Sequence, residues 1–307
     1  MAPKKALKSN LKDFSNWWKR KSKKIILPGL EGLTLYNLWV IFWGGIVKGT
    51  FSTRASAIAF SFFMALFPFL LFILNLIPYI NFIDDFQLQF LSFMQDLLPP
   101  NTVEFFDSIF YDIADNQRGG LLSLSFILSI FLMTNGINAV FTGFEFSYHT
   151  RRNRSIVRQY MVAIPVSLIM ASLLFLTVIL AVYLTYAVDD LNALGLVEKG
   201  GLGASLVKYA AFVLLNYTGV ATLYYFGTKE ARKARFFSVG ATFTTLLIML
   251  NTYFFGVYIE NFSSYNELYG SIGALLILMI YIWLNANILL LGFELNASLL
   301  KMKRKIE

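Results

Sequence analysis

The chain of 307 residues contains no cysteine and a single histidine, His149. The lack of cysteine excludes disulfides, zinc sites with thiolate ligands and thiol catalysis. Phosphodiester hydrolysis needs an acid cluster that holds two metal ions, or paired acid and base groups such as histidines. Neither pattern accompanies His149, which lies beside Arg151 and Arg152 in a connection between apolar stretches. We therefore expect no ribonuclease or other enzyme, and no cofactor or metal site.

Charged residues are scarce, at 14% of the chain, whereas 57% of the residues are apolar. Soluble proteins contain roughly 45–50% apolar residues. Runs of about 20 apolar residues match the ~30 Å hydrocarbon layer of a bilayer. The sequence therefore predicts an all-α polytopic membrane protein with six transmembrane helices. We place them at 55–77, 121–146, 160–188, 202–226, 236–258 and 269–298.

One side of this predicted membrane protein has almost no basic residues. Of the 26 Lys and Arg residues, 23 fall near the two ends of the chain and in every second connection; the other side has only Arg118, Lys199 and Lys208, with 12 of the 18 acids. Basic residues remain on the cytosolic side of an inner membrane. The pattern predicts a bacterial inner-membrane protein with cytosolic termini. We expect no nucleic-acid partner, because the net charge of +8 follows the topology instead of marking one domain.

The predicted domains follow from this topology. A basic cytosolic region spans residues 1–54, the transmembrane domain spans 55–300, and a basic cytosolic tail spans 301–307. Residues 33–47 are apolar but too short to cross the bilayer, so they form either an interfacial or a re-entrant helix. On the outer side, residues 78–120 carry apolar side chains at helical spacing, which predicts amphipathic helices there. Interfacial or amphipathic helices are thus expected on both sides.

Aromatic and basic residues are neighbours near the N-terminus, at Trp17, Trp18, Lys19 and Arg20. Such a mixture favours the headgroup zone of an anionic leaflet. A solvated tail that only sets the orientation of the chain is the alternative. The expected partners are accordingly lipids of the anionic inner leaflet, and the sequence leaves open whether the protein forms a homo-oligomer.

The interiors of the predicted helices contain a few informative residues. Pro68 and Pro165 remove backbone donors, which predicts a kink in the first and in the third helix. Asn251 lies near mid-depth in the fifth helix, where an asparagine often bonds to a neighbouring helix. Gly240 and Gly256 in that helix predict close packing between helices.

The candidate site consists of polar residues at membrane depth, because such residues are costly in lipid and must face protein or water. The second span places Asn135, Asn138 and Glu145 on one face. The sixth span places Asn287 and Glu294, which are seven residues apart, on one face. At ~1.5 Å per residue, the glutamates of both spans lie at one depth near the cytosolic edge. This predicts a polar network of Arg54, Asn135, Asn138, Glu145, Asn287 and Glu294. It either lines a path for a substrate or a proton, or holds helix ends together.

Five segments together resemble a known family. They are RASAIAFSFFMALFP at 54–68, NGIN at 135–138, GFE at 143–145, YGSIG at 269–273 and LGFELN at 291–296. These segments are similar to elements of the YihY/BrkB family of bacterial inner-membrane proteins, historically labelled ribonuclease BN. The resemblance covers roughly residues 50–300. It implies six transmembrane helices with both ends in the cytosol, in agreement with the charge pattern, and it implies little about activity.

Two functions fit these observations. The first is a transporter or translocator of a small or lipid-like substrate, with the polar stripes of spans two and six lining the path. The second is a non-transporting scaffold in envelope biogenesis, whose basic N-terminal region binds anionic lipid or a cytosolic partner. The sequence alone does not name a substrate, a direction of transport or a source of energy.

Overall fold

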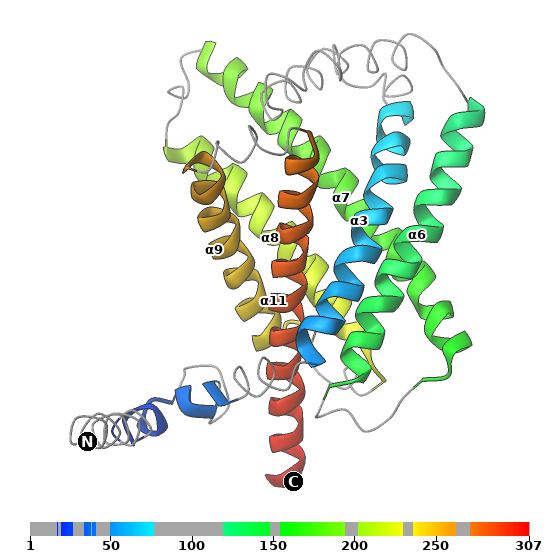
Figure 1. Ribbon diagram of the computed structural model, residues 1–307. Helices are drawn as coiled ribbons and strands as arrows, with labels where there is room; N and C mark the ends of the chain where they lie inside the picture. Colours follow the sequence, from blue (N-terminus) through cyan, green and yellow to red (C-terminus); the bar gives the residue numbers. More distant parts are fainter. Residues whose placement is uncertain are drawn as a thin grey trace, which may run out of the picture.

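The computed structural model describes residues 17, 20–26, 34–37, 39–40, 50–76, 119–147, 154–193, 202–229, 236–261 and 271–306. Within these ranges the long regular elements are all α-helices (Figure 1). They are α3 (Thr50–Leu76), α6 (Gly119–Glu145), α7 (Ile156–Ala193), α8 (Leu202–Gly227), α9 (Val239–Asn261) and α11 (Ser271–Ile306). The predicted all-α class is confirmed for this part of the chain.

Five of these helices are long and apolar enough to cross a membrane. In the described residues the candidate spans are Phe51–Leu76, Gly119–Glu145, Ile156–Leu180, Val239–Tyr258 and Leu275–Leu300, from α3, α6, α7, α9 and α11. The helix α8 is not among these five, so a sixth span remains a prediction. The amphipathic segment expected on the outer side lies outside the described residues up to residue 118.

Several helices run further than their apolar stretches. The helix α7 begins at Ile156 and ends at Ala193, and α11 continues through the predicted C-terminal tail to Ile306. Backbone hydrogen bonding does not stop where the hydrocarbon layer ends, so hydropathy understates helix length. Pro68 lies inside α3 and Pro165 inside α7, and neither helix ends at its proline.

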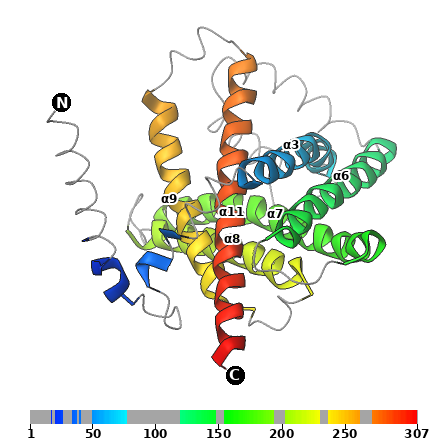
Figure 2. The ribbon, with the colours of Figure 1, turned by 60° about the horizontal axis from the view of Figure 1, so that its bottom comes forward.

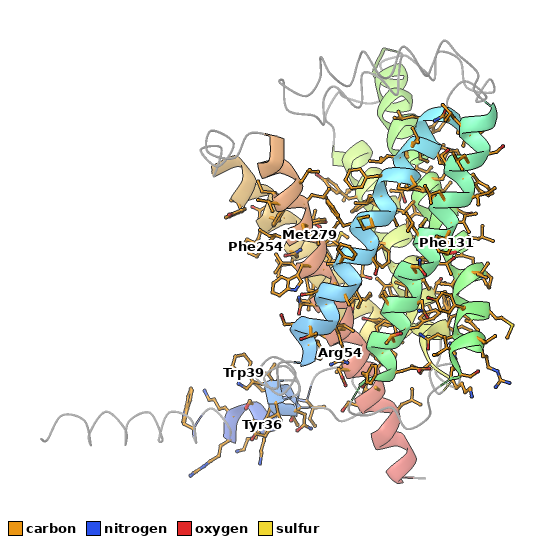
Figure 3. The ribbon with its side chains drawn as sticks, turned by 45° about the vertical axis from the view of Figure 1, so that its right-hand side comes forward. Tyr36, Trp39, Arg54, Phe131, Phe254 and Met279 are labelled. Atoms are coloured by element: carbon orange, nitrogen blue, oxygen red, sulfur yellow. The ribbon has the colours of Figure 1, made fainter. Side chains whose placement is uncertain are left out.

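The six helices pack in chain order as a closed ring. Each helix contacts the next one in the sequence, and α11 returns to contact α3 (Figure 2). Because consecutive helices alternate in direction, α3, α7 and α9 begin at the end of the bundle where α6 and α8 finish (Figure 1). We call this the basic end. Tyr36 and Trp39, from the described part of the predicted interfacial segment, also lie at this end (Figure 3).

The buried core lies in the half of the bundle nearest the basic end. There α11 is buried at every position from Leu289 to Leu295. In the far half, four helices bury none of their described side chains: the last buried positions are Ser167 on α7, Val220 on α8, Thr245 on α9 and Ala286 on α11. Among the described helices, only α3 and α6 bury side chains in the far half, at Ile73 and Ser125 for example.

Two glycines bring α9 and α11 together in the dense half. A methyl group added at Gly292 of α11 would overlap Thr244 Oγ1 and lie 2.5 Å from Tyr224 Oη. A methyl group added at Gly240 of α9 would overlap the Gly292 carbonyl oxygen. By contrast, a methyl group at Gly256 in the far half of α9 would meet nothing within 4 Å. Close helix packing is therefore found at Gly240 and not at Gly256.

Candidate functional site

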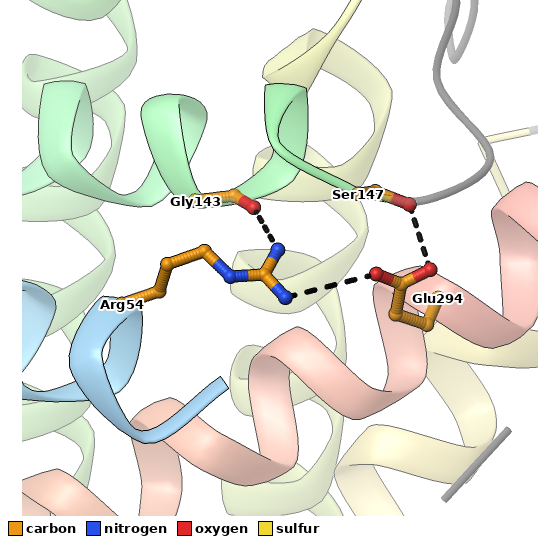
Figure 4. Close-up of polar contacts among 4 residues, drawn as sticks. All are labelled: Arg54, Gly143, Ser147 and Glu294. Atoms are coloured by element: carbon orange, nitrogen blue, oxygen red, sulfur yellow. Dashed lines mark hydrogen bonds and ion pairs between the residues drawn. The ribbon is translucent and has the colours of Figure 1, made fainter. Parts of the chain in front are cut away.

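An ion pair connects three helices at the basic end. Arg54 of α3 places Nη2 3.9 Å from Glu294 Oε1 of α11, and its Nη1 donates to the Gly143 carbonyl of α6 at 2.8 Å (Figure 4). Ser147, just beyond α6, donates to Glu294 Oε2 at 2.7 Å. The side chains of Arg54 and Glu294 are only 13% and 8% exposed. Glu294 is thus buried, Arg54 is largely shielded from solvent, and both charges have partners.

A second buried arginine connects α6, α7 and α8. Arg154, directly before α7, donates from its backbone N–H to Glu145 Oε1 at 3.0 Å and from Nη1 to the Phe226 carbonyl at 2.8 Å. The residue is 7% exposed. The two arginines and two glutamates, together with Ser147, form what we call the basic-end layer: Arg54, Glu145, Ser147, Arg154 and Glu294.

Helix ends explain why charges are stable in this layer. Gly143 and Phe226 lie in the last turns of α6 and α8, where carbonyl oxygens lack helical partners and carry partial negative charge. Both receive an arginine donor. Glu145 accepts a hydrogen bond at the beginning of α7, where free N–H groups carry partial positive charge. Arg54, Arg154 and Glu145 therefore each meet a helix end of opposite sign, whereas Glu294 pairs with Arg54 and Ser147.

Aromatic rings pack beneath the layer. Phe144 of α6 stacks on Phe293 of α11 with ring centroids 4.0 Å apart and planes within 8°. Tyr224 of α8 meets both rings edge-on, at 5.6 and 5.8 Å. The guanidinium of Arg54 lies 4.9 Å from the centre of the Phe51 ring. The layer and these rings form a continuous buried block across α3, α6, α8 and α11.

The polar stripe of α6 faces α7. Gln159 Nε2 donates to Asn138 Oδ1 at 2.7 Å and to Thr142 Oγ1 at 2.8 Å. Tyr160 donates to Asn135 Oδ1 at 3.2 Å. Gln159 is buried, at 6% exposed. Asn135 and Asn138 therefore join two helices that are adjacent in the sequence.

The polar residues of α11 divide between two neighbours. Glu294 points to α3 and α6, whereas Asn285 accepts from Asn251 Nδ2 of α9 at 3.3 Å. Asn287 donates to the Trp283 carbonyl of its own helix at 2.8 Å. Among the predicted network residues, the structure brings Arg54 and Glu294 together, while Asn287 and the asparagines of α6 make separate contacts. The expected bond from Asn251 to a neighbouring helix is present.

The contact between α9 and α11 continues as a row of polar groups, which we call the α9–α11 seam. Near the basic end, Asn296 accepts from the Gly240 N–H at 2.8 Å. Next to it Thr244 bonds to Tyr224 Oη at 2.6 Å, and Tyr224 donates to the Leu289 carbonyl at 2.7 Å. The Asn251–Asn285 pair follows, and Thr252 bonds to Tyr281 at 2.7 Å in the far half.

The N-terminal residues predicted to contact lipid are described only in part. Trp17 is 52% exposed, and Lys21 Nζ lies 4.8 Å from the centre of its ring. Arg20 is also exposed. Trp18 and Lys19 lie outside the described residues. The described side chains are thus exposed, and the lipid contact stays a prediction.

Sequence reasoning missed Arg154, Ser147, Gln159 and Tyr224 as parts of the site. Arg154 is one of three arginines between α6 and α7, and nothing in the sequence separates the buried one from the others. Gln159 carried a usable signal, because it is an uncharged polar residue inside the first turns of α7. In the part of the chain that the structure describes, no three His, Asp or Glu side chains gather as metal ligands.

Comparison with known proteins agrees with this picture of a helical membrane protein. The ribonuclease-like protein YfkH of Bacillus subtilis is 26% identical over 260 residues, which covers 82% of this chain and 91% of YfkH. A UPF0761 membrane protein of Psychrobacter is 23% identical over 275 residues, covering 87% of this chain and 49% of that protein. A UPF0761 membrane protein of Coxiella burnetii is 23% identical over 243 residues, covering 78% and 84%.

No solved structure matches the chain. The family profile of Virulence factor BrkB matches residues 42–306. This range contains all six long helices and every residue of the basic-end layer. The chain therefore belongs to the Virulence factor BrkB family of membrane proteins.

Proposed function

We propose that this protein is a six-span inner-membrane translocator of a small or lipid-like substrate, with both termini in the cytosol. The sixth span is α8, whose 26 residues extend about 39 Å. It packs between the candidate spans α7 and α9. The basic end then faces the cytosol, because 23 of the 26 basic residues belong to that side.

The observation that carries the proposal is the unequal packing of the two halves. Alternating-access translocators close one side of a central site while the other side is open. Here four helices bury none of their described side chains in the far half, whereas α11 is buried all around at the basic end. We interpret this as a closed cytosolic side, with the basic-end layer as its gate.

The chemistry of the layer favours a gate over a permanent fastening. A buried ion pair gives little net stability, because desolvation of both charges offsets their attraction. Apolar residues of similar volume would hold the helix ends at least as well. Arg54 binds one carboxylate, one carbonyl and one ring, and an arginine that moves toward cytosolic headgroups exchanges such partners for water and phosphate.

Cysteine accessibility tests this function, since the natural chain has no cysteine that would react. Ser147→Cys reports on the layer and Thr252→Cys on the far half. In vesicles whose outer side is exposed, we expect an impermeant maleimide to label Thr252→Cys and not Ser147→Cys. Ser147→Cys should also stay protected in vesicles of the opposite orientation. Adding Glu294→Gln should open the layer, so that Ser147→Cys reacts from the cytosolic side in those vesicles.

Glu145→Gln is the matched control, because Glu145 lies in the same layer but contacts a backbone N–H instead of Arg54. It should leave Ser147→Cys protected. Each variant must first give a single symmetric peak in size-exclusion chromatography. Protection of Ser147→Cys in the folded Glu294→Gln protein would contradict the gate and with it the translocator.

The scaffold function has one observation in its favour, the exposed Trp17 beside Lys21 at the basic end. Deleting residues 1–30 separates the two functions. A translocator core should keep the accessibility change at Ser147→Cys, whereas a scaffold should lose its bound lipid or partner.

The name of YfkH suggests ribonuclease activity for that relative. We do not extend this activity to the present chain, because His149 is its single histidine and has no second histidine as an acid–base partner.

A further inference from the structure

We propose that the α9–α11 seam carries the headgroup of an amphiphilic substrate whose headgroup is uncharged and forms hydrogen bonds. This inference rests on the proposed translocator function and names its class of substrate. It comes from three observations: the chemistry of the seam, a buried hydroxyl without a partner, and the apolar surface on either side.

The seam offers only neutral hydrogen-bonding groups. Its far half contains two amides and two hydroxyls, from Asn251, Asn285, Thr252 and Tyr281, all half-buried. The side chains that form the hydrogen bonds of the seam carry no charge. A phosphate or carboxylate entering there would find no counter-charge and would lose its hydration. Hydroxyl-rich headgroups can instead exchange water for these amides and hydroxyls.

Thr245 supplies the second observation. It is 3% exposed, and its Oγ1 has no hydrogen-bond partner among the described residues. Thr245 lies two helical turns from Thr252, hence on the same face of α9 and about 10 Å closer to the basic end. Buried hydroxyls are normally satisfied, so an orphan one suggests a missing partner. It is the buried residue of α9 that lies nearest the far half, so a headgroup entering from there would meet it.

Apolar side chains border the far half of the seam. On α9, Phe254 is 60% exposed, and on α11, Leu276 and Ile280 are 43% and 48% exposed. Phe254 and Met279 lie well away from Arg54 along the bundle (Figure 3). This surface suits acyl chains that remain in the lipid while the headgroup follows the polar seam. A free sugar would not need it.

The seam closes toward the basic end, as a headgroup track in an inward-closed state requires. Gly240 and Gly292 bring the two backbones into contact there, and Tyr224 bonds to both Thr244 and the Leu289 carbonyl. A headgroup that reaches Thr245 would be stopped by this contact. Passage therefore requires α9 and α11 to separate at the glycines when the basic-end layer opens.

Reconstituted full-length protein tests the proposal with three probes. NBD-labelled glucosylceramide has a neutral sugar headgroup, NBD-labelled phosphatidylglycerol has an anionic one, and trapped radiolabelled glucose is a sugar without acyl chains. Dithionite bleaching reports how fast each labelled lipid crosses the bilayer. We expect glucosylceramide to cross faster than phosphatidylglycerol by on the order of a hundredfold, since an unpaired charge costs several kcal/mol in the bilayer core. Trapped glucose should stay inside.

Thr245→Val separates a ligand contact from a packing role. If the hydroxyl bonds a headgroup, the variant should move glucosylceramide about tenfold more slowly. Its apparent Tm should stay the same or rise, because valine removes an unsatisfied polar atom. Thr177→Val is the matched control, since Thr177 bonds to the Leu173 carbonyl of its own helix; it should leave the rate unchanged.

Each outcome decides one part of the proposal. Equal rates for the two lipids, efflux of glucose, or an unchanged rate in Thr245→Val would overturn it. If no probe moves while Glu294→Gln still exposes Ser147→Cys, the substrate class is wrong and the translocator function stands. If Ser147→Cys also stays protected in the Glu294→Gln protein, both the substrate class and the translocator function are wrong.

Discussion

The two halves of this helix bundle are built from different interactions. Near the basic end, glycines allow the helices to touch, aromatic rings stack, and buried charges meet helix ends. In the far half, α7, α8, α9 and α11 bury no described side chain, and the polar side chains that join α9 to α11 there are neutral. The same six helices run through both halves. The difference between the halves therefore comes from the side chains that change along each helix.

The comparison shows what holds helices together in lipid. Lipid tails are as apolar as leucine, so apolar surface alone gives helices little reason to associate. Close backbone approach and hydrogen bonds between helices supply the association instead. The dense half has both. The far half has hydrogen bonds in the seam without the close approach, which leaves it freer to change shape.

The largest effect should come from breaking the ion pair. Glu294→Ala leaves the Arg54 guanidinium, 13% exposed, without its carboxylate, and removing one partner of a buried pair typically costs about 3–5 kcal/mol. We expect the apparent Tm in detergent to fall strongly. The double variant Arg54→Met with Glu294→Leu should recover most of the loss. If Glu294→Ala melts like the natural protein, the pair is not buried as described.

The next largest effect tests the close approach of α9 and α11. Gly292→Ala should overlap Thr244 and Tyr224, and overpacking of this kind typically costs about 1–3 kcal/mol. Gly256→Ala is its control, because the added methyl meets nothing within 4 Å; it should be neutral, or stabilising by up to ~1 kcal/mol through helix propensity. Thermal unfolding of both variants measures the contrast. Equal losses would remove the distinction between the halves.

A smaller loss is expected where α6 meets α7. Gln159→Leu deletes the donor shared by Asn138 and Thr142, and a buried group left unsatisfied typically costs about 1–3 kcal/mol. Because Asn138 can turn toward its own helix, we expect the lower end of that range. Asn287→Leu provides the comparison, since Asn287 donates to the Trp283 carbonyl of its own helix. It should change the apparent Tm less.

The smallest effect should come from the far half. Asn251→Leu removes the 3.3 Å bond to Asn285, and hydrogen bonds between membrane helices average about 0.6 kcal/mol. The apparent Tm should change by a degree or two at most on that scale. A loss as large as that of Gly292→Ala would show that the far half is held as firmly as the basic end.

Depth in the membrane was predictable, whereas direction around each helix was less so. Counting residues along apolar runs placed Arg54, Glu145 and Glu294 near one level, and they lie in one layer at the basic end. The count does not say which helices are neighbours in the ring. Glu145 accordingly bonds to the start of α7 and not to Arg54.

The polar stripes show the same limit. Helical periodicity put Asn135 and Asn138 on one face of α6, and both bond to α7. It also put Asn287 and Glu294 on one face of α11, yet Glu294 pairs with Arg54 of α3 while Asn287 bonds within its own helix. Asn285, beside them, bonds to α9. Periodicity identifies a face but not what that face meets. The asparagines of α6 bond to α7, whereas Glu294 of α11 pairs with α3. These contacts do not test whether spans two and six line one path, so that expectation stays a prediction.

The amino-acid sequence by itself determined that this is a helical membrane protein and at what depth its charges lie, because hydrocarbon thickness and helical rise translate directly into residue counts. Only the tertiary structure decided which charges pair, which arginine of the α6–α7 connection is buried, and that α9 and α11 touch at two glycines. These outcomes depend on how the helices are ordered and rotated in the ring. That order is set by contacts between residues far apart in the chain, which no local pattern encodes.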